Sequence, residues 1–275
     1  MKEKTEKNEI QMEKVLRYAE LDEKELPLME FDPDYKSITK PKTDYDLSHK
    51  VERCLFTYFQ DIIGVYERNY LVNQVFLMRT EGVRPRVMEM KVGNEYIYVV
   101  PVPAGAPQAA RMLEQMAALG IKKFMVCGGA GSLDEEVTNN RILLPTSAVR
   151  DEGTSYHYLP PSRTVEINPT VQKKIEKVLT ASGEAFRNVK TWTTDASFRE
   201  TPSKVMLRKR EGCSVVEMEC AAYYAVAQFK RLQCGQLLYA GDLVKPEGWE
   251  YRNWHNKTDE REKLFNLAVQ CLMEL

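Results

Sequence analysis

The sequence predicts an α/β fold with three layers, in which helices cover both faces of a central, mixed sheet. Strand-like and helix-like segments alternate over most of the chain, which is the pattern of such folds. With 275 residues, 43% of them hydrophobic, the chain can bury one large core. One of the buried strands runs directly into a helix through two carboxylates, Glu217 and Glu219. We therefore expect a single α/β domain with chemistry at the ends of its strands.

The first fifty residues differ from the rest of the chain in composition and apolar pattern. Residues 1–50 are charged and poor in sustained apolar pattern, although Met12, Val15, Leu16 and Ala19 could line one face of a short helix. We predict a charged N-terminal extension over 1–50 and one domain over 51–275.

Within the domain, each element is predicted from its apolar pattern and its boundary residues. Residues 55–59 and 95–102 are rich in aromatic and β-branched side chains and read as strands. A helix is predicted over 106–119, closed by Gly120 in the C′ position, and the strand 122–127 follows directly. The remaining predicted strands are 141–149, 189–194, 213–217 and 236–241, and the remaining predicted helices are 169–181, 202–211, 219–232 and 258–275.

Net charge and the counts of cysteine and histidine argue against several kinds of binding partner and metal site. The formal net charge of −1 gives no bulk attraction to nucleic acid or to an anionic membrane, so we expect a small-molecule partner. Six scattered cysteines without a C-x-x-C pair read as reduced core residues. Three histidines, none spaced against a cysteine, argue against a zinc site, and we predict no metal. The sequence shows no apolar signal region or ~20-residue apolar run, which predicts a cytoplasmic protein.

The segment 215–222 carries the strongest functional signal. Val215 and Val216 end a buried strand and a strongly apolar helix follows, so Glu217 and Glu219 lie close to the core. A buried carboxylate needs donors or a charge partner, and a ligand rich in hydroxyls would provide donors. Alternatively, both glutamates merely cap the following helix, where negative charge suits its dipole.

A glycine-rich loop forms the second signal. The predicted strand 122–127 runs into Gly128, Gly129, Ala130, Gly131 and Ser132. Glycines at the carboxyl end of a strand let backbone N–H groups approach an anion or a sugar, in the crevice where open α/β sheets bind ligands. A plain tight turn is the alternative.

Several segments together resemble the nucleoside phosphorylase family, and most closely its uridine phosphorylases. The segments that carry this resemblance are 117–124, 128–133, 146–158 and Val216-Glu-Met-Glu-Cys-Ala-Ala222, in the family's order, within a region of about 87–275. The resemblance implies a twisted, barrel-like mixed sheet. It also implies homodimers or rings of dimers, in which a neighbouring subunit completes each site.

The resemblance implies roles for the charged residues in N-glycosidic bond cleavage, which builds positive charge on the ribose and negative charge on the leaving base. Glu219 would accept hydrogen bonds from ribose hydroxyls, Met218 would pack under the sugar, and Glu217 would help to hold the ribose and base side. Asp242 matches an aspartate that protonates the leaving base in purine-acting and nucleosidase members. A turn or N-cap aspartate is the alternative.

Residues 194–201 look like the base-side loop of the family. Phe198 could stack on a flat base and Arg199 could bond a carbonyl edge, while Asp195 would hold the loop. Equally, Phe198 could be a core residue, and Arg199 could form a solvated pair with Glu200. The residue pair with which uridine phosphorylases read uracil is absent, so purine and pyrimidine both stay open. His157 is expected at the surface or an interface.

The phosphate site is where the chain departs from the family. Its Gly-Asp-Pro-x-Arg loop is replaced by residues 59–64, and a second arginine by Val126. Arg79 could match the arginine that a neighbouring subunit contributes, and Arg84 or Arg86 could substitute, although both could be plain surface residues.

Three functions are therefore predicted, none needing a cofactor. The first is a nucleoside phosphorylase, a pentosyltransferase with phosphate as co-substrate, which uses Gly128, Gly129, Ala130 and Gly131 together with replacement cations such as Arg79. The second is a nucleosidase that uses water instead. The third is a sensor that binds a nucleoside or nucleotide without turnover.

Overall fold

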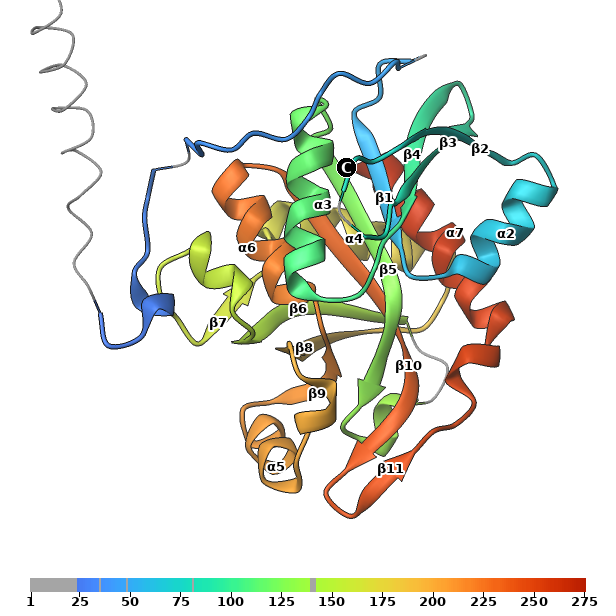
Figure 1. Ribbon diagram of the computed structural model, residues 1–275. Coiled ribbons are helices and arrows are strands. Elements are labelled where there is room, and N and C mark those ends of the chain that lie inside the picture. The colour runs from blue at the N-terminus through green and yellow to red at the C-terminus, as the bar shows by residue number, and fades with distance from the viewer. Residues whose placement is uncertain (1–23, 35, 48, 81, 139–141) are drawn as a thin grey trace, which may run out of the picture.

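The structure is a computed structural model that describes residues 24–275 except 35, 48, 81 and 139–141. Its core is one mixed sheet surrounded by helices (Figure 1). The strands of this sheet are β1 (Arg53–Thr57), β2 (Val72–Leu77), β3 (Arg86–Val92), β4 (Glu95–Pro101), β5 (Lys123–Ser132), β6 (Ile142–Asp151), β7 (Thr164–Glu166), β8 (Phe186–Thr194), β9 (Cys213–Glu217), β10 (Gln233–Lys245) and β11 (Gly248–Glu250).

Five strands close on themselves. In the order β10-β6-β8-β9-β5, each strand pairs with the next, and β5 pairs in turn with β10 over residues 123–132. β1, β4, β3 and β2 extend the sheet from β5, with β1 parallel to both β4 and β5. The predicted barrel-like mixed sheet is thereby confirmed.

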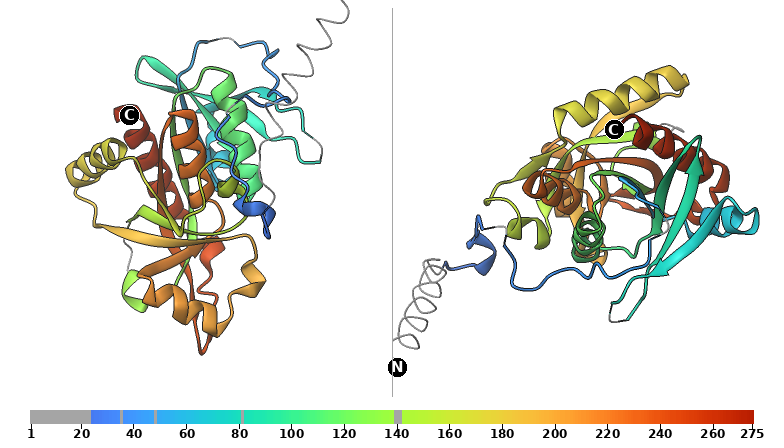
Figure 2. Two further views of the ribbon diagram at one scale, coloured as in Figure 1. Left: turned by 90° about the vertical axis from the view of Figure 1, so that its left-hand side faces the viewer. Right: turned by 90° about the horizontal axis from the view of Figure 1, so that it is seen from above.

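The helices surround this sheet, and several of them pack on one another. The helices are α2 (Gln60–Arg68), α3 (Ala106–Ala118), α4 (Pro169–Ser182), α5 (Pro202–Arg210), α6 (Cys220–Lys230) and α7 (Thr258–Glu274). α3 packs on α6, and α4 packs on α7. Figure 2, seen from above, shows strands of the sheet between the two pairs.

Local chemistry explains where several helices start and stop. The Asn168 side chain accepts the amides of Thr170 and Val171 at the start of α4, and Gly183, at φ 72°, ends that helix. Thr201 caps α5 in the same way through the amide of Lys204. α6 is short and almost wholly buried from Cys220 to Ala227, because its apolar residues surround it on all sides.

Most predicted elements lie within a few residues of their predicted ends, and two differ in a way that matters. The glycine loop is wrong as a turn, since β5 continues through Gly128, Gly129 and Gly131 to Ser132. Similarly, Asp242 lies inside β10 rather than after its predicted end. β5 pairs with β10 up to Ala130 and again at Ser132, which keeps both segments extended, while Asp242 lies at an irregularity of this pairing between Ala240 and Leu243.

Some features were not predicted, and some predictions lie outside the described residues. The elements that were not predicted are α2, the hairpin β2–β3 and the short strands β7 and β11. The proposed helix face at Met12, Val15, Leu16 and Ala19 lies outside the described residues. Within the described part of the chain, no helix has the length and apolar character needed to cross a membrane.

Candidate active site

Glu217 ends β9 with its carboxylate held entirely by neighbouring protein groups. It is 6% exposed. Its Oε1 accepts the hydroxyls of Thr193 (2.6 Å) and Thr191 (3.2 Å), and its Oε2 accepts the amides of Glu219 (2.8 Å) and Cys220 (2.6 Å). Four hydrogen bonds fill the acceptor capacity of a carboxylate. Burial still raises the pKa of Glu217 from its usual value, against the effect of these donors. Glu217 therefore fixes the turn from β9 into α6.

Glu219 is equally buried but has fewer donors. Its Oε1 accepts the Gly105 amide at 2.6 Å, and a backbone hydrogen bond from Met218 also favours its charged form. Burial first, and then the charge of Glu217, raise the pKa of Glu219 to about 8. This carboxylate keeps acceptor capacity for a ligand, and hydroxyl donors would favour its charged form.

Gly105 positions Glu219, and sequence reasoning missed it. Its φ of 108° is a conformation that side chains with a Cβ rarely adopt. In this conformation its amide points at the carboxylate of Glu219, one residue before α3 begins. The signal available in the sequence was a glycine directly before the Ala106-Pro107 start of a predicted helix.

The ring of Tyr58 packs against Gly128, the first residue of the stretch 128–132, which we call the glycine segment. A Cβ on Gly128 would lie 2.9 Å from the Tyr58 ring, so only glycine permits this approach. The phenol oxygen of Tyr58 lies 3.0 Å from that of Tyr223 on α6. Burial, and then the charge of Glu219, raise the pKa of Tyr58 well above its usual value. Tyr58 thus lies beside both Gly128 and the charge of Glu219.

The backbone amides of the first two residues after β1 are already used. The amide of Tyr58 donates to the carbonyl of Cys127 (3.2 Å), and that of Phe59 donates to the Thr57 hydroxyl (3.1 Å). An anion cradle needs free amides or cations. Val126, where the family resemblance would place an arginine, is a fully buried apolar residue. Neither of these two amides, nor Val126, is therefore available to bind a phosphate.

At the other end of the glycine segment, Gly131 lies beside Asp242. A Cβ on Gly131 would lie 3.0 Å from Val216 and 3.3 Å from Oδ1 of Asp242, so both residues border this glycine. Oδ2 of Asp242 accepts the indole N–H of Trp249 at 2.6 Å. Three residues of strand, or roughly 10 Å, separate Gly128 from Gly131. The segment therefore links the surroundings of Glu219 to those of Asp242.

Glu200 is a second carboxyl near Asp242 that the sequence did not single out. Burial first, and then the charge of Asp242, raise the pKa of Glu200 to about 7. The structure shows no ion pair between Arg199 and Glu200, and Arg199 is exposed. A carboxyl whose pKa is raised by burial and by a neighbouring charge is a candidate for an acid or base role.

The remaining predicted site residues are exposed, half-buried or paired with residues outside the surroundings of Glu219 and Asp242. Among the residues that the structure describes, Phe198 is fully exposed, Met218 is half-buried, and His157 is exposed. Arg79 is exposed and pairs with Asp44 (3.0 Å). The roles assigned to these residues stay predictions. Of the two possible substitutes for the lost arginines, Arg84 is exposed and Arg86 pairs with Glu67 (2.9 Å).

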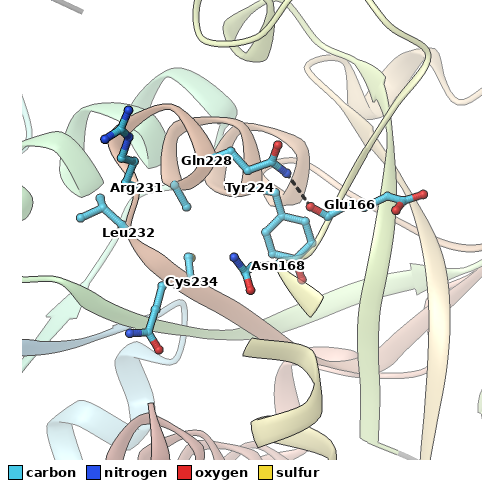
Figure 3. A pocket seen from close by; sticks show the side chains of 9 residues that line it. Glu166, Asn168, Tyr224, Gln228, Arg231, Leu232 and Cys234 are labelled. Atoms are coloured by element: carbon cyan, nitrogen blue, oxygen red, sulfur yellow. Dashed lines mark hydrogen bonds between the residues drawn. The ribbon is translucent and has the colours of Figure 1, made fainter. Parts of the chain in front are cut away.

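Two cavities in the structure differ in their relation to the predicted site residues. One, of about 330 Å³, lies near the end of α6 and is lined by Tyr224, Gln228, Arg231 and neighbours (Figure 3). The Gln228 amide there donates to the Glu166 carbonyl at 2.7 Å. None of the predicted site residues lines it. The other, of about 850 Å³, is lined by residues that include Asp195 and Arg79, and lies beside the start of α3.

Comparison with known sequences places most of the chain in one family. A family model described as the phosphorylase superfamily matches residues 64–272. An uncharacterized protein of Acanthamoeba polyphaga mimivirus is 25% identical over 195 residues, which span 71% of this chain and 74% of that protein. A guanosine phosphorylase of Halorubrum lacusprofundi is 28% identical over 145 residues, or 51% of this chain and 58% of the relative.

Solved structures share the fold. Purine nucleoside phosphorylase from Toxoplasma gondii, in complex with immucillin-H, matches with a TM-score of 0.70 and 18% identity, covering 81% of this chain and 91% of its own. AMP nucleosidase from Bacteroides thetaiotaomicron matches with a TM-score of 0.63 and 20% identity, covering 81% and 88%. Both phosphorylases and hydrolases are thus built on this fold.

Proposed function

Because this chain belongs to the phosphorylase superfamily, we propose that it cleaves the N-glycosidic bond of a nucleoside. The observation that carries the proposal is the contrast between the two glutamates. Glu217 accepts four hydrogen bonds from protein donors, whereas Glu219 accepts backbone hydrogen bonds from Gly105 and Met218 only and is held towards the start of α3 by the Gly105 amide. Hydroxyl groups of a ribose would supply the missing donors and favour the carboxylate.

We assign the leaving base to the end of the glycine segment at Gly131, beside Asp242. Asp242 has one oxygen bound by Trp249 and the other beside Gly131, so it can carry a proton towards a group that lies over that glycine. Proton donation to a leaving base removes its developing negative charge. The charge of Asp242 helps to raise the pKa of Glu200, so the two carboxyls interact through their charges.

Water is our first candidate for the nucleophile. The Tyr58 and Phe59 amides are used, Tyr58 fills the space against Gly128, and Val126 is apolar. Two cations beside β5 and β10 also have partners, since Lys257 donates to the Ala240 carbonyl (3.2 Å) and Arg261 pairs with Asp61 (3.1 Å). These contacts support a nucleosidase over a phosphorylase.

Phosphorolysis is the second candidate. The family model and the guanosine phosphorylase relative support it, and Arg79 from a neighbouring subunit would supply a cation in a homo-oligomer. Such an assembly stays a prediction. Binding without base release would instead support the sensor.

The proposal is tested by the ribose hydroxyls themselves. We expect the protein to bind a ribonucleoside at least tenfold more tightly than the matching 2′,3′-dideoxynucleoside, roughly the effect of one charge-assisted hydrogen bond. The variant Glu219→Ala should lose this preference, whereas Glu52→Ala, at an exposed position on the surface, should keep it. Equal binding of both compounds by the unmodified protein would refute the assignment of Glu219.

A further inference from the structure

The described part of the N-terminal extension is a strap across the outside of the domain. We call residues 24–34 and 36–47 the strap; it runs past α3 towards the β2–β3 hairpin (Figures 1 and 2). Leu28 lies beside Gly153, Gln115 on α3 donates to the Lys42 carbonyl (2.5 Å), and Tyr45 stacks on Phe76 with ring centroids 4.3 Å apart. These three anchors hold the strap along its length.

A cavity of about 850 Å³ lies between the strap and α3, and its charged lining is mainly basic. Four cationic side chains line it: Lys40 and Lys42 from the strap, Arg79 from the loop after β2, and Arg111 from α3. Its volume is in the range of cavities that hold small ligands. A concave site of one sign concentrates potential and attracts an oppositely charged ligand.

The acidic residues of the cavity do not neutralise these cations. Glu114 is bound by Lys230 (3.0 Å) and by the Tyr158 hydroxyl (2.7 Å), and Asp195 accepts the Gly153 amide (2.9 Å). Arg79 pairs with Asp44. To the residues that the structure describes, Lys40, Lys42 and Arg111 make no ion pair. The cavity therefore has an excess of positive charge that an anion would balance.

The cavity adjoins the proposed ribose site. Pro107, which lines it, is two residues after Gly105, the donor to Glu219. Asp195 lines it from the end of β8, and its charge acts on the carboxyl of Glu219. A ribose bound by Glu219 would thus have the strap cavity on one side.

We propose that the strap cavity binds the phosphate of a nucleoside 5′-phosphate, which makes a nucleotide rather than a nucleoside the preferred substrate. Lys40, Lys42 and Arg111 would hold the phosphate by charge-assisted hydrogen bonds. This inference rests on the proposed function, because it takes the ribose to lie on Glu219. Two of these cations, Lys40 and Lys42, come from the strap, and the third comes from α3.

The test compares each nucleoside with its own 5′-monophosphate in full-length protein, by base release and by calorimetric binding. We expect the monophosphate to have a KM or Kd at least tenfold lower than the nucleoside, with a preference that declines as salt rises. In the variant Lys40→Gln/Lys42→Gln, and separately in Arg111→Gln, the monophosphate should lose this advantage while the nucleoside is unchanged. The control Lys36→Gln, an exposed strap lysine outside the cavity lining, should keep it.

The two proposals fail in different ways. Cleavage or binding of nucleosides without preference for the monophosphate, or a preference that survives in all the cavity variants, would overturn the nucleotide inference and leave the proposed function intact. A change of oligomeric state in the cavity variants, with the substrate preference unaltered, would assign the cations to a subunit interface and overturn the inference. Binding of neither compound by the unmodified protein would overturn both proposals.

Discussion

At the scale of single residues, Glu219 and Glu217 show how similar side chains two positions apart take different tasks. Both are 6% exposed, and both were assigned to the ribose from the sequence alone. Their partners could not be predicted, because Thr191, Thr193 and Gly105 come from β8 and from the start of α3. The sequence shows that two carboxylates lie near the core, but only tertiary contacts show which of them is left for a ligand.

The raised pKa of Glu219 makes nucleoside binding depend on pH. Its pKa is about 8 without ligand, and hydroxyl donors favour the charged form, so binding should release a proton below that pH. We expect affinity to rise as the pH is raised towards 8 and to level off above it. Calorimetry in buffers of different ionisation enthalpy measures the released proton. In Glu219→Gln the proton release should vanish; its persistence would assign the titration to another group.

The raised pKa of Glu219 also makes the stability of the fold depend on pH. A carboxyl whose pKa is raised in the folded state favours folding when protonated, so its contribution is present below pH 4.5 and is lost as the pH rises through about 8. Glu219→Gln should therefore raise the Tm at pH 8 relative to the unmodified protein, with a smaller difference at pH 5. Thermal unfolding at the two pH values measures this. An equal Tm at pH 8 would argue that Glu219 is not strained by its burial.

Asp242 and Glu200 are expected to govern the pH dependence of catalysis. Asp242→Asn should lower kcat by ~10²–10⁴-fold, the usual effect of losing a general acid. Glu200→Gln should instead remove the limb of the pH–rate profile near pH 7 and leave most of the rate, because Glu200 acts on Asp242 by charge. Profiles of both variants check this. A loss of rate in Glu200→Gln as large as that in Asp242→Asn would place the proton on Glu200.

At the scale of elements, two close approaches shape the site. The ring of Tyr58, after β1, reaches Gly128 because that position has no Cβ, and Gly105 reaches Glu219 through a conformation that favours glycine. Local pattern predicted β5 up to Cys127 and α3 almost to the residue. It failed at the glycines, where pairing with β10 extends β5 and overrides the turn preference of Gly-Gly.

Gly105→Ala tests how the start of α3 supports the site. A Cβ there has room, since its nearest neighbour would be Pro107 at 3.9 Å, so the cost comes from backbone strain. We expect a loss of about 1–2 kcal/mol in the free energy of unfolding, together with weaker ribonucleoside binding as the amide turns away from Glu219. Denaturant unfolding and calorimetry measure the two effects. The matched control Gly93→Ala, also at positive φ but far from the site in the turn between β3 and β4, should lose stability only. Unchanged binding in Gly105→Ala would show that its amide does not position Glu219.

At the scale of the whole molecule, the closed ring of five strands brings distant segments to one place. Glu219 follows β9, Asp242 belongs to β10 and the glycine segment to β5, and pairing of β5 with both other strands joins them. The alternation of strands and helices predicted the fold class, and the resemblance predicted the barrel. Neither could predict that the extension forms a strap, because residues 24–47 lack a regular pattern and are positioned by scattered contacts.

The central claim is that this protein cleaves an N-glycosidic bond with water as the nucleophile. The most direct measurement is chromatography of the products formed from purine and pyrimidine nucleosides and their 5′-monophosphates, with and without added phosphate. The account predicts free base and free ribose, or ribose 5-phosphate from a nucleotide, at a rate that added phosphate does not raise. Base release that requires phosphate and yields a ribose 1-phosphate product would contradict the choice of nucleophile. No base release from any compound would contradict the claim of catalysis itself.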